Sequence, residues 1–232
     1  MARRSLATRL IVLALASAGC RSVAPEGPLP EGWHTLVAPP YSFAGLYRLT
    51  CCGHSDMVLA VRADGTRLGL TVMLPPAITV LNAWVDGSNG WLVARGGHCR
   101  TQLGRGTLPI GESATLPLDG TLAAMLLLGL LPPGASAIPA AQGWVQAIGD
   151  DWWLRARVEG PTPHLVRVLI GRPGDDAPRL VADFERVRGS VPAGIVLRAG
   201  ATTASLALES LGAVTAPAVP AWLSWPACES AP

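Results

Sequence analysis

The sequence predicts a mainly β fold, a curved antiparallel sheet of about ten or eleven strands with one short apolar helix. Two observations carry this prediction. Short segments in which apolar and polar residues alternate follow one another along most of the chain, separated by turn-forming residues. One segment, residues 121–131 (TLAAMLLLGLL), is instead almost entirely apolar. So many consecutive strands favour an antiparallel sheet that curls or closes.

The strand predictions rest on alternation and on turn residues. In residues 152–159 every second residue from Trp152 to Val158 is apolar, which is typical of a half-buried antiparallel strand. Asp64-Gly65 stands between two such segments and predicts a hairpin, because both residues adopt positive φ readily. Strands are predicted at residues 42–50, 57–63, 67–74, 77–85, 91–95, 142–148, 152–159, 164–171, 179–187, 194–199 and 202–209.

The apolar segment at residues 121–131 is predicted to be a helix. Asp119 precedes it as a candidate N-cap, and Pro132-Pro133 ends it. A helix that is apolar on every face cannot lie exposed to water. It is expected to plug the curved sheet as a core helix, to line a lipid-binding cavity as a lid, or to touch a membrane. The candidate lipid-contacting residues are Met125, Leu126, Leu127, Leu128, Leu130 and Leu131.

The N-terminus has the order of a secretory signal peptide. In residues 1–19, arginines precede a short apolar run and small residues, and the run is far shorter than the ~20 residues that cross a bilayer. The ending Ser-Ala-Gly-Cys resembles the lipobox of bacterial lipoproteins, which implies that Cys20 carries an acyl group such as palmitate. Residues 20–40 are rich in proline and are expected to form a lipidated tether, and residues 41–228 the folded domain.

Charge and motifs predict neither an enzyme nor a nucleic-acid-binding protein. The 232 residues include 18 basic and 16 acidic ones, and removing the three arginines of the leader leaves 15 against 16. No basic patch indicates a nucleic-acid partner. His54, Ser55 and Asp56 are consecutive and cannot converge as a catalytic triad. The chain also lacks a glycine-rich phosphate loop, and the sequence indicates no cofactor.

Four cysteines besides Cys20 indicate disulfides, because an exported protein matures in an oxidising compartment. A bridge between the neighbours Cys51 and Cys52 would be strained. We therefore expect one of them to pair with Cys99 and the other with Cys228.

The same region offers a metal site as an alternative. If the turn that holds Cys51, Cys52 and His54 meets the turn that holds His98 and Cys99, thiolates and imidazoles suited to zinc or copper come together. The spacing matches no standard zinc finger or ribbon, and oxidation would favour pairing of the cysteines first.

Tryptophan dominates the aromatic residues of this chain, with eight of them against two tyrosines and two phenylalanines. Such side chains either fill the interior of a curved sheet or stack on a ligand. The candidate cavity residues among them are Trp84, Trp91, Trp144 and Trp152.

An ordered set of short motifs resembles the LolA/LolB group of lipoprotein carriers and outer-membrane receptors over roughly residues 41–228. Phe43, Gly45 and Tyr47 form the pattern F-x-G-x-Y. Leu-Pro-Leu and Gly-Leu-Leu-Pro then flank the apolar segment, and Val-Pro-Ala-Gly-Ile and Val-Pro-Ala-Trp-Leu follow later in the chain. None of these motifs is a catalytic signature.

The resemblance implies an incomplete antiparallel barrel, covered by helices, whose apolar cavity receives the acyl chains of lipoproteins. It further implies a lipid-anchored protein of the bacterial cell envelope at the outer membrane, facing the periplasm. Its partners would be the membrane, lipoprotein acyl chains or a periplasmic carrier. One departure is that residues 21–40 are too rich in proline for the amphipathic helix that usually precedes the first strand. The alternative is a non-catalytic structural or assembly lipoprotein whose interior is filled by its own side chains.

Overall fold

The computed structural model describes the greater part of the chain from Trp33 onward. The leader, residues 20–32 and 37–40 of the expected tether (Cys20 among them) and residue 41 lie outside the described residues. The described residues are 33–36, 42–87, 89–103, 108–110, 114–116, 120–132, 138–140, 144–148, 152–188, 191–212 and 218–228.

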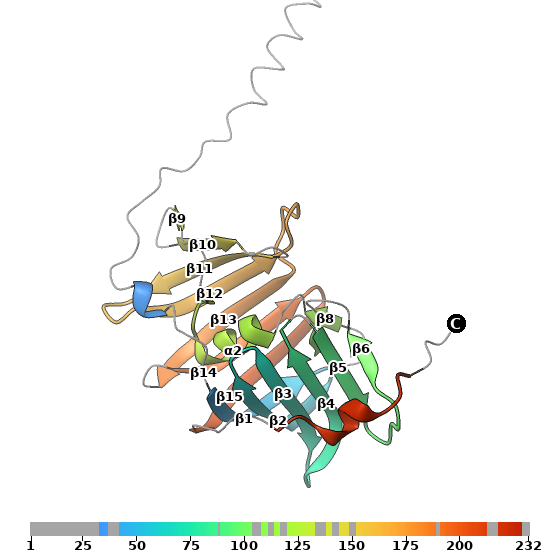
Figure 1. Ribbon diagram of the computed structural model, residues 1–232. Helices are drawn as coiled ribbons and strands as arrows, with labels where there is room; N and C mark the ends of the chain where they lie inside the picture. Colours follow the sequence, from blue (N-terminus) through green and yellow to red (C-terminus); the bar gives the residue numbers. More distant parts are fainter. Residues whose placement is uncertain are drawn as a thin grey trace, which may run out of the picture.

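Thirteen strands form one antiparallel sheet that curves around a short helix without closing into a barrel (Figure 1). Two of them, β6 and β9, have only three residues each, which leaves eleven longer strands and confirms the predicted fold class. In spatial order from the first edge to the centre the strands are β6 (Thr101–Leu103), β5 (Asn89–Ala94), β4 (Ile78–Asp86), β3 (Arg67–Leu74), β2 (His54–Asp64) and β1 (Ser42–Cys51). The order continues through β15 (Thr202–Gly212), β14 (Val191–Ala199), β13 (Leu180–Arg188), β12 (His164–Gly171), β11 (Trp153–Glu159), β10 (Trp144–Ile148) and β9 (Ile138–Ala140).

The first and last strands meet at the centre of the sheet, where β1 pairs with β15. Every other strand pairs with its neighbour in the chain, so β6 and β9 form the two edges. The connection between these edges carries the two-stranded pair β7 (Leu108–Ile110) and β8 (Ala114–Leu116) and then the helix α2 (Gly120–Leu128). This topology places the apolar helix inside the curve of the sheet.

The hairpin between β2 and β3 confirms one turn prediction and shifts it by one residue. Asp64 pairs with Arg67, so the loop consists of Gly65 and Thr66 rather than of Asp64-Gly65. Gly65 has a φ of 58°, which glycine adopts without the steric cost that other residues meet there.

Alternation gives the sheet two distinct faces. On the inner face, which contacts α2, the cross-strand row Phe43, Ala63, Leu68 and Val85 belongs to the hydrophobic core. On the outer face the adjacent row runs through Arg62, Gly69, Trp84 and Trp91. Because successive residues of a strand point to opposite sides, this register fixes which side chains can meet the helix.

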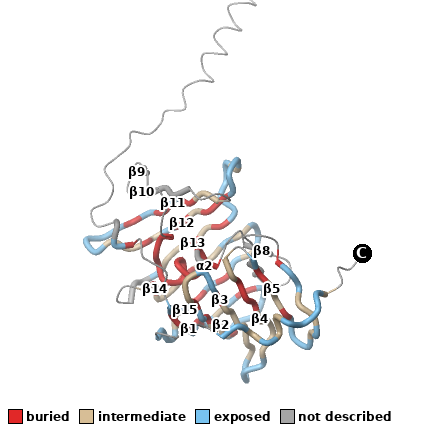
Figure 2. The backbone as a smooth tube through the Cα atoms, in the orientation of Figure 1, coloured by how far each residue is buried: buried red, intermediate tan, exposed pale blue. Residues whose placement is uncertain are grey.

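The core lies between the inner face and α2, and Figure 2 shows buried backbone concentrated there. The predicted helix is confirmed but ends at Leu128, and the next two leucines, Leu130 and Leu131, stay buried beyond it. Leu36, in the short 3-10 helix η1 (Trp33–Leu36), is also part of this core. The packed fold therefore begins within the segment expected to be a tether. Among the described residues, no helix has the length and apolarity that crossing a membrane requires.

Candidate functional site

The predicted lipid-contacting leucines and Met125 gather on the inner face of the sheet. Met125 has no exposed surface, and the most exposed of the six residues, Leu127 and Leu130, keep only 8 %. All six belong to one core cluster with residues of β1 to β4 and β11 to β15. Among the described residues, no charged side chain is buried with them, and the Tyr47 hydroxyl is the polar side-chain group that the cluster contains. This site can therefore hold hydrocarbon.

The F-x-G-x-Y motif fastens the helix to the sheet. Phe43, Gly45 and Tyr47 alternate along β1 and so face inward together. The Tyr47 ring lies over Gly45, where an added Cβ would come within 2.8 Å of the ring. From there the Tyr47 hydroxyl donates a hydrogen bond to the carbonyl oxygen of Leu127, 3.3 Å away. Burial raises the pKa of Tyr47 above its ordinary value, so this hydroxyl keeps its proton to a higher pH than an exposed tyrosine does.

The C-terminal end of α2 has a glycine-dependent cap. The Leu130 N–H donates to the Met125 carbonyl at 2.9 Å, and the Gly129 N–H donates to the Leu126 carbonyl at 3.0 Å. This pair of bonds is the Schellman motif, which needs a left-handed residue, and Gly129 has a φ of 70°. The cap ends the helix and turns the chain so that the next two leucines return to the core.

Two further contacts hold this end of the helix in place. The Leu131 N–H donates to the Leu36 carbonyl at 2.8 Å, which joins the helix segment to η1. Gly129 also packs closely against Pro192 of β14, because an added Cβ would lie 2.7 Å from the Pro192 ring. Tyr47, Leu36 and Pro192 were not among the predicted site residues. For Tyr47 the signal was present in the sequence, since its spacing from Phe43 places both on one face.

The candidate tryptophans divide between the two sides of the sheet. Trp152 packs against the core cluster, as expected for a cavity residue. Trp84, Trp91 and Trp144 lie instead on the outer face, away from α2. Trp84 and Trp91 pair across β4 and β5, and Trp144 pairs with the exposed Arg157. The prediction that these three residues line the same cavity as the leucines is corrected by this register.

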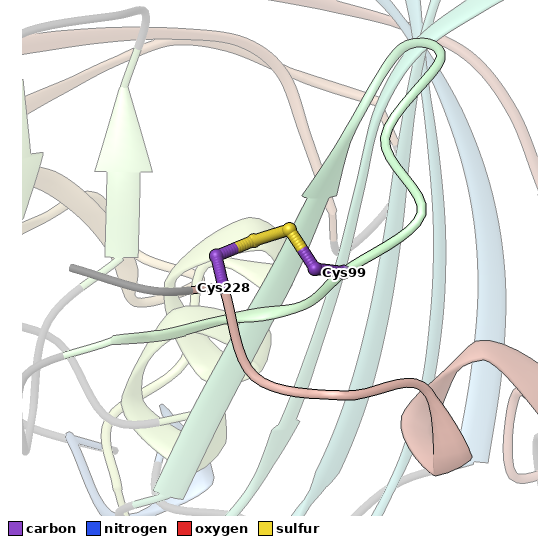
Figure 3. The surroundings of a disulfide bond; sticks show 2 residues. All are labelled: Cys99 and Cys228. Atoms are coloured by element: carbon purple, nitrogen blue, oxygen red, sulfur yellow. A yellow bond between two sulfur atoms is a disulfide. The ribbon is translucent and has the colours of Figure 1, made fainter. Parts of the chain in front are cut away.

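The expected cysteine pairing is wrong, because the structure bonds Cys99 to Cys228, with a Cα–Cα distance of 4.9 Å (Figure 3). The neighbouring backbone explains this choice. The Arg100 N–H donates to the Pro226 carbonyl, and the Cys228 N–H donates to the Arg100 carbonyl, each at 2.9 Å. These bonds lay the C-terminal segment alongside residue 100. The disulfide itself is as predicted for an exported chain; its partners are not.

Cys51 and Cys52 remain free at the tip of the β1–β2 hairpin. Cys51 is buried on the inner face, whereas Cys52 is exposed. Burial, followed by the hydrogen bond and charge of Cys52, raises the pKa of the Cys51 thiol to about 12.

The metal-site alternative does not assemble in the structure. Cys99 uses its sulfur in the bond to Cys228, and so cannot join Cys51, Cys52 and His54 around an ion. Within the part of the chain that the structure describes, no group of three or more histidine, cysteine, aspartate or glutamate side chains is arranged to hold a metal.

Thiol labelling should distinguish the buried Cys51, the exposed Cys52 and the disulfide-bonded Cys99 and Cys228. In the chain from residue 21 onward, iodoacetamide at pH 8 is expected to modify Cys52 alone in the native state, because the Cys51 thiol is buried and protonated. Denaturation without reductant should expose two thiols, and denaturation with reductant four, as counted by mass spectrometry. A denatured, unreduced protein without reactive thiols would contradict the assignment.

Comparison with known proteins bears on the fold alone. No family model matches the chain, and no curated protein matches it. A solved LolA superfamily protein from Nitrosomonas europaea superimposes with a TM-score of 0.54 at 10 % identity, over 78 % of this chain and 90 % of that one. A beta-barrel-like protein of a domain of unknown function from Brucella abortus has a TM-score of 0.32 at 12 % identity, over 76 % and 99 % of the two chains. The open sheet, its internal helix and the first of these superpositions agree: this chain has a LolA-like fold.

Proposed function

We propose that this chain is a non-catalytic, lipid-anchored protein of the bacterial envelope that binds the acyl chains of lipoproteins against the inner face of its sheet. Its role would be lipoprotein localisation to the outer membrane. The observation that carries the proposal is α2, a helix apolar on every face that lies buried across an open, curved sheet. The lipobox-like ending at Cys20 supports the anchor.

Displacement of α2 by acyl chains exchanges one apolar surface for another. The helix buries methionine and leucine side chains, so acyl methylenes in the same place replace hydrocarbon with hydrocarbon, and the Tyr47 hydroxyl is the side-chain group that loses its partner. Each buried CH₂ contributes about 0.8 kcal/mol, so the total contribution of an acyl chain rises with its length. This total offsets the lost contacts of the helix. At the C-terminal end of α2, a ligand must also break two hydrogen bonds, from the Tyr47 hydroxyl to the Leu127 carbonyl and from the Leu131 N–H to the Leu36 carbonyl.

A second function is favoured by a specific observation. The inner face of the structure is already occupied by the chain's own helix, as a structural or assembly lipoprotein with a permanently filled interior would require. The two functions make opposite predictions about what happens when α2 is loosened or locked.

Loosening α2 should strengthen acyl binding. Tyr47→Phe removes the hydrogen bond to the Leu127 carbonyl and is expected to lower the free energy that holds the helix by about 1 kcal/mol. The apparent affinity for a fluorescent palmitoylated peptide should then rise about fivefold, because it follows the population of the binding-competent state. The measurement is fluorescence anisotropy on the chain from residue 21 onward, which retains every described residue. Thermal stability should fall in the same variant.

Locking α2 to the sheet by a disulfide should have the opposite effect and prevent acyl binding. An ideal Cβ at Gly120 would lie 3.2 Å from the Val85 Cβ, a few tenths of an ångström below the usual disulfide range. In a Cys51→Ala, Cys52→Ser background, the pair Gly120→Cys, Val85→Cys should lose peptide binding when oxidised and recover it on reduction. The same background without the new pair is the control for reduction of Cys99–Cys228. Saturable binding that ignores both Tyr47→Phe and the lock, or no binding in any variant, would favour the filled-interior alternative.

A further inference from the structure

A groove of about 440 Å³ lies on the outer face of the sheet, opposite the helix. One side is formed by β2, β3 and β4, and the other by the C-terminal segment of residues 218–228, which we call the strap. Figure 1 shows the strap with its 3-10 helix η3 (Ala221–Ser224) crossing in front of β3 and β4. The residues that matter most are Arg62, Gly69, Thr71, Trp84, Val219 and Trp222. The volume lies within the range of roughly 300–1,000 Å³ that is usual for small-molecule sites.

Small residues create the space. Gly69 stands between Arg62 and Trp84 in the cross-strand row, and Ala60 lies in the adjacent row beside Thr71. A Cβ added at Gly69 would meet the Trp84 ring at 3.5 Å and the Arg62 carbonyl oxygen at 3.8 Å, both ordinary van der Waals contacts. The floor is thus open because its side chains are short and not because the backbone is strained.

The strap forms one wall of this groove and is held in place by covalent and hydrogen bonds. It is covalently fixed at Cys228 and hydrogen-bonded at Arg100, and its own turn is closed by a Leu223 N–H to Pro220 carbonyl bond of 3.0 Å. Trp84 beneath it is buried although it faces away from the core, whereas Val219 at the rim is 62 % exposed. The strap therefore covers the floor while leaving one apolar edge open to solvent.

Arg62 gives the groove its charge. Several other arginines of the outer face pair with carboxylates, as in Arg48–Glu209 and Arg67–Asp86, while Arg167 and Arg198 share Asp183. For Arg62 the described residues provide no such partner, and its cross-strand neighbours are Ala44 and Gly69. The only side-chain hydrogen bond between floor residues joins Thr71 to Asn82 at 2.9 Å, within the described chain.

We propose that this groove binds a single-chain anionic amphiphile, a fatty carboxylate, with its alkyl chain against Trp84, Met73 and Trp222 and its carboxylate on Arg62. The groove is mainly apolar with one unneutralised cation at its side, which is the complement of an alkyl carboxylate. It lies on the face of the sheet opposite to α2. The proposal therefore stands independently of acyl binding on the inner face.

The test uses laurate as the probe and dodecanol as its uncharged counterpart, titrated into the chain from residue 21 onward by calorimetry. Gly69→Leu fills the floor and should abolish binding of both. Gly212→Leu is the matched control, because that strand glycine has nothing within 4 Å of an added Cβ. Arg62→Gln should weaken laurate about fivefold, in line with an exposed ion pair, and leave dodecanol unchanged.

The outcomes also separate this groove from the inner face. Tyr47→Phe should not alter laurate binding in the groove, although it should strengthen acyl binding next to α2. Laurate affinity that is unchanged by Gly69→Leu in a variant with the wild-type melting temperature would overturn the proposal. So would dodecanol binding as tightly as laurate, or a response to Tyr47→Phe instead of to Gly69→Leu.

Discussion

Replacing Gly129 by alanine is expected to lower the free energy of unfolding by about 2–5 kcal/mol. Two effects add. A left-handed φ of 70° costs a residue with a side chain about 1–2 kcal/mol. The new Cβ would also lie 2.7 and 2.8 Å from two carbons of the buried Pro192 ring, and overpacking of this kind costs about 1–3 kcal/mol. Urea denaturation followed by circular dichroism measures the sum.

Gly200→Ala separates the two effects. Gly200 has a φ of 57° in the β14–β15 hairpin, and nothing lies within 4 Å of an added Cβ. Its replacement should cost only the conformational part, about 1–2 kcal/mol. Equal losses in the two variants would show that β14 yields easily at Pro192, and the close packing of the helix end on the sheet would then not be a constraint on α2.

The position of Gly129 matters for function because α2 must be able to leave the inner face under the proposed mechanism. The cap at Gly129 and the Tyr47 hydrogen bond act on the same last turn of the helix. A loss of either should loosen this turn, yet only Tyr47→Phe leaves the sheet undisturbed. The stability of the Gly129 variant and the acyl affinity of the Tyr47 variant thus both test how firmly the last turn of α2 is held.

The sequence predicted the strands and the buried helix because both are local patterns. The alternation from Trp152 to Val158 places its apolar side chains on one face of a strand. The seven consecutive apolar residues from Leu122 to Leu128 exclude a helix exposed to water. Pairing within hairpins is also predictable, because the two strands are consecutive in the chain and a short turn joins them. The pairing of β1 with β15, which closes the centre of the sheet, joins segments about 160 residues apart and has no local signal, as Arg48 and Glu209 illustrate (|i−j| = 161).

The predictions that failed depended on tertiary contacts. Alternation assigns Trp84 to the face opposite Val85, but it does not say which face holds the core. An apolar Trp84 suggested an interior, and it is indeed buried, by the strap rather than by the helix. The cysteine pairing failed for the same reason. The backbone hydrogen bonds at Arg100 lay residues 226–228 beside Cys99, and such a contact between distant segments has no local signal in the sequence.

Replacing both Cys99 and Cys228 by serine is expected to lower the free energy of unfolding by about 2–4 kcal/mol. The bond joins residues 129 positions apart, so it restricts a long loop of the unfolded chain. It also holds the strap over Trp84, which is only 3 % exposed. Detachment of the strap should shift the tryptophan emission to longer wavelength in native buffer. The same replacement in a Trp84→Phe background measures the part of the shift that comes from Trp84, since Trp222 of the strap also lines the groove.

A chain that ends at Gly212 tells the contribution of the bond from that of strap packing. If the bond is what keeps the strap in place, the double-serine variant should match this truncated chain in its free energy of unfolding. Cys52→Ser is the control for cysteine replacement, and at an exposed position it should change stability by less than about 0.5 kcal/mol. A double-serine variant as stable as the wild type, with unshifted emission, would mean that the two hydrogen bonds at Arg100 and the packing on Trp84 suffice. The strap would then be part of the cooperative fold, and the outer groove would keep its wall in a reducing environment.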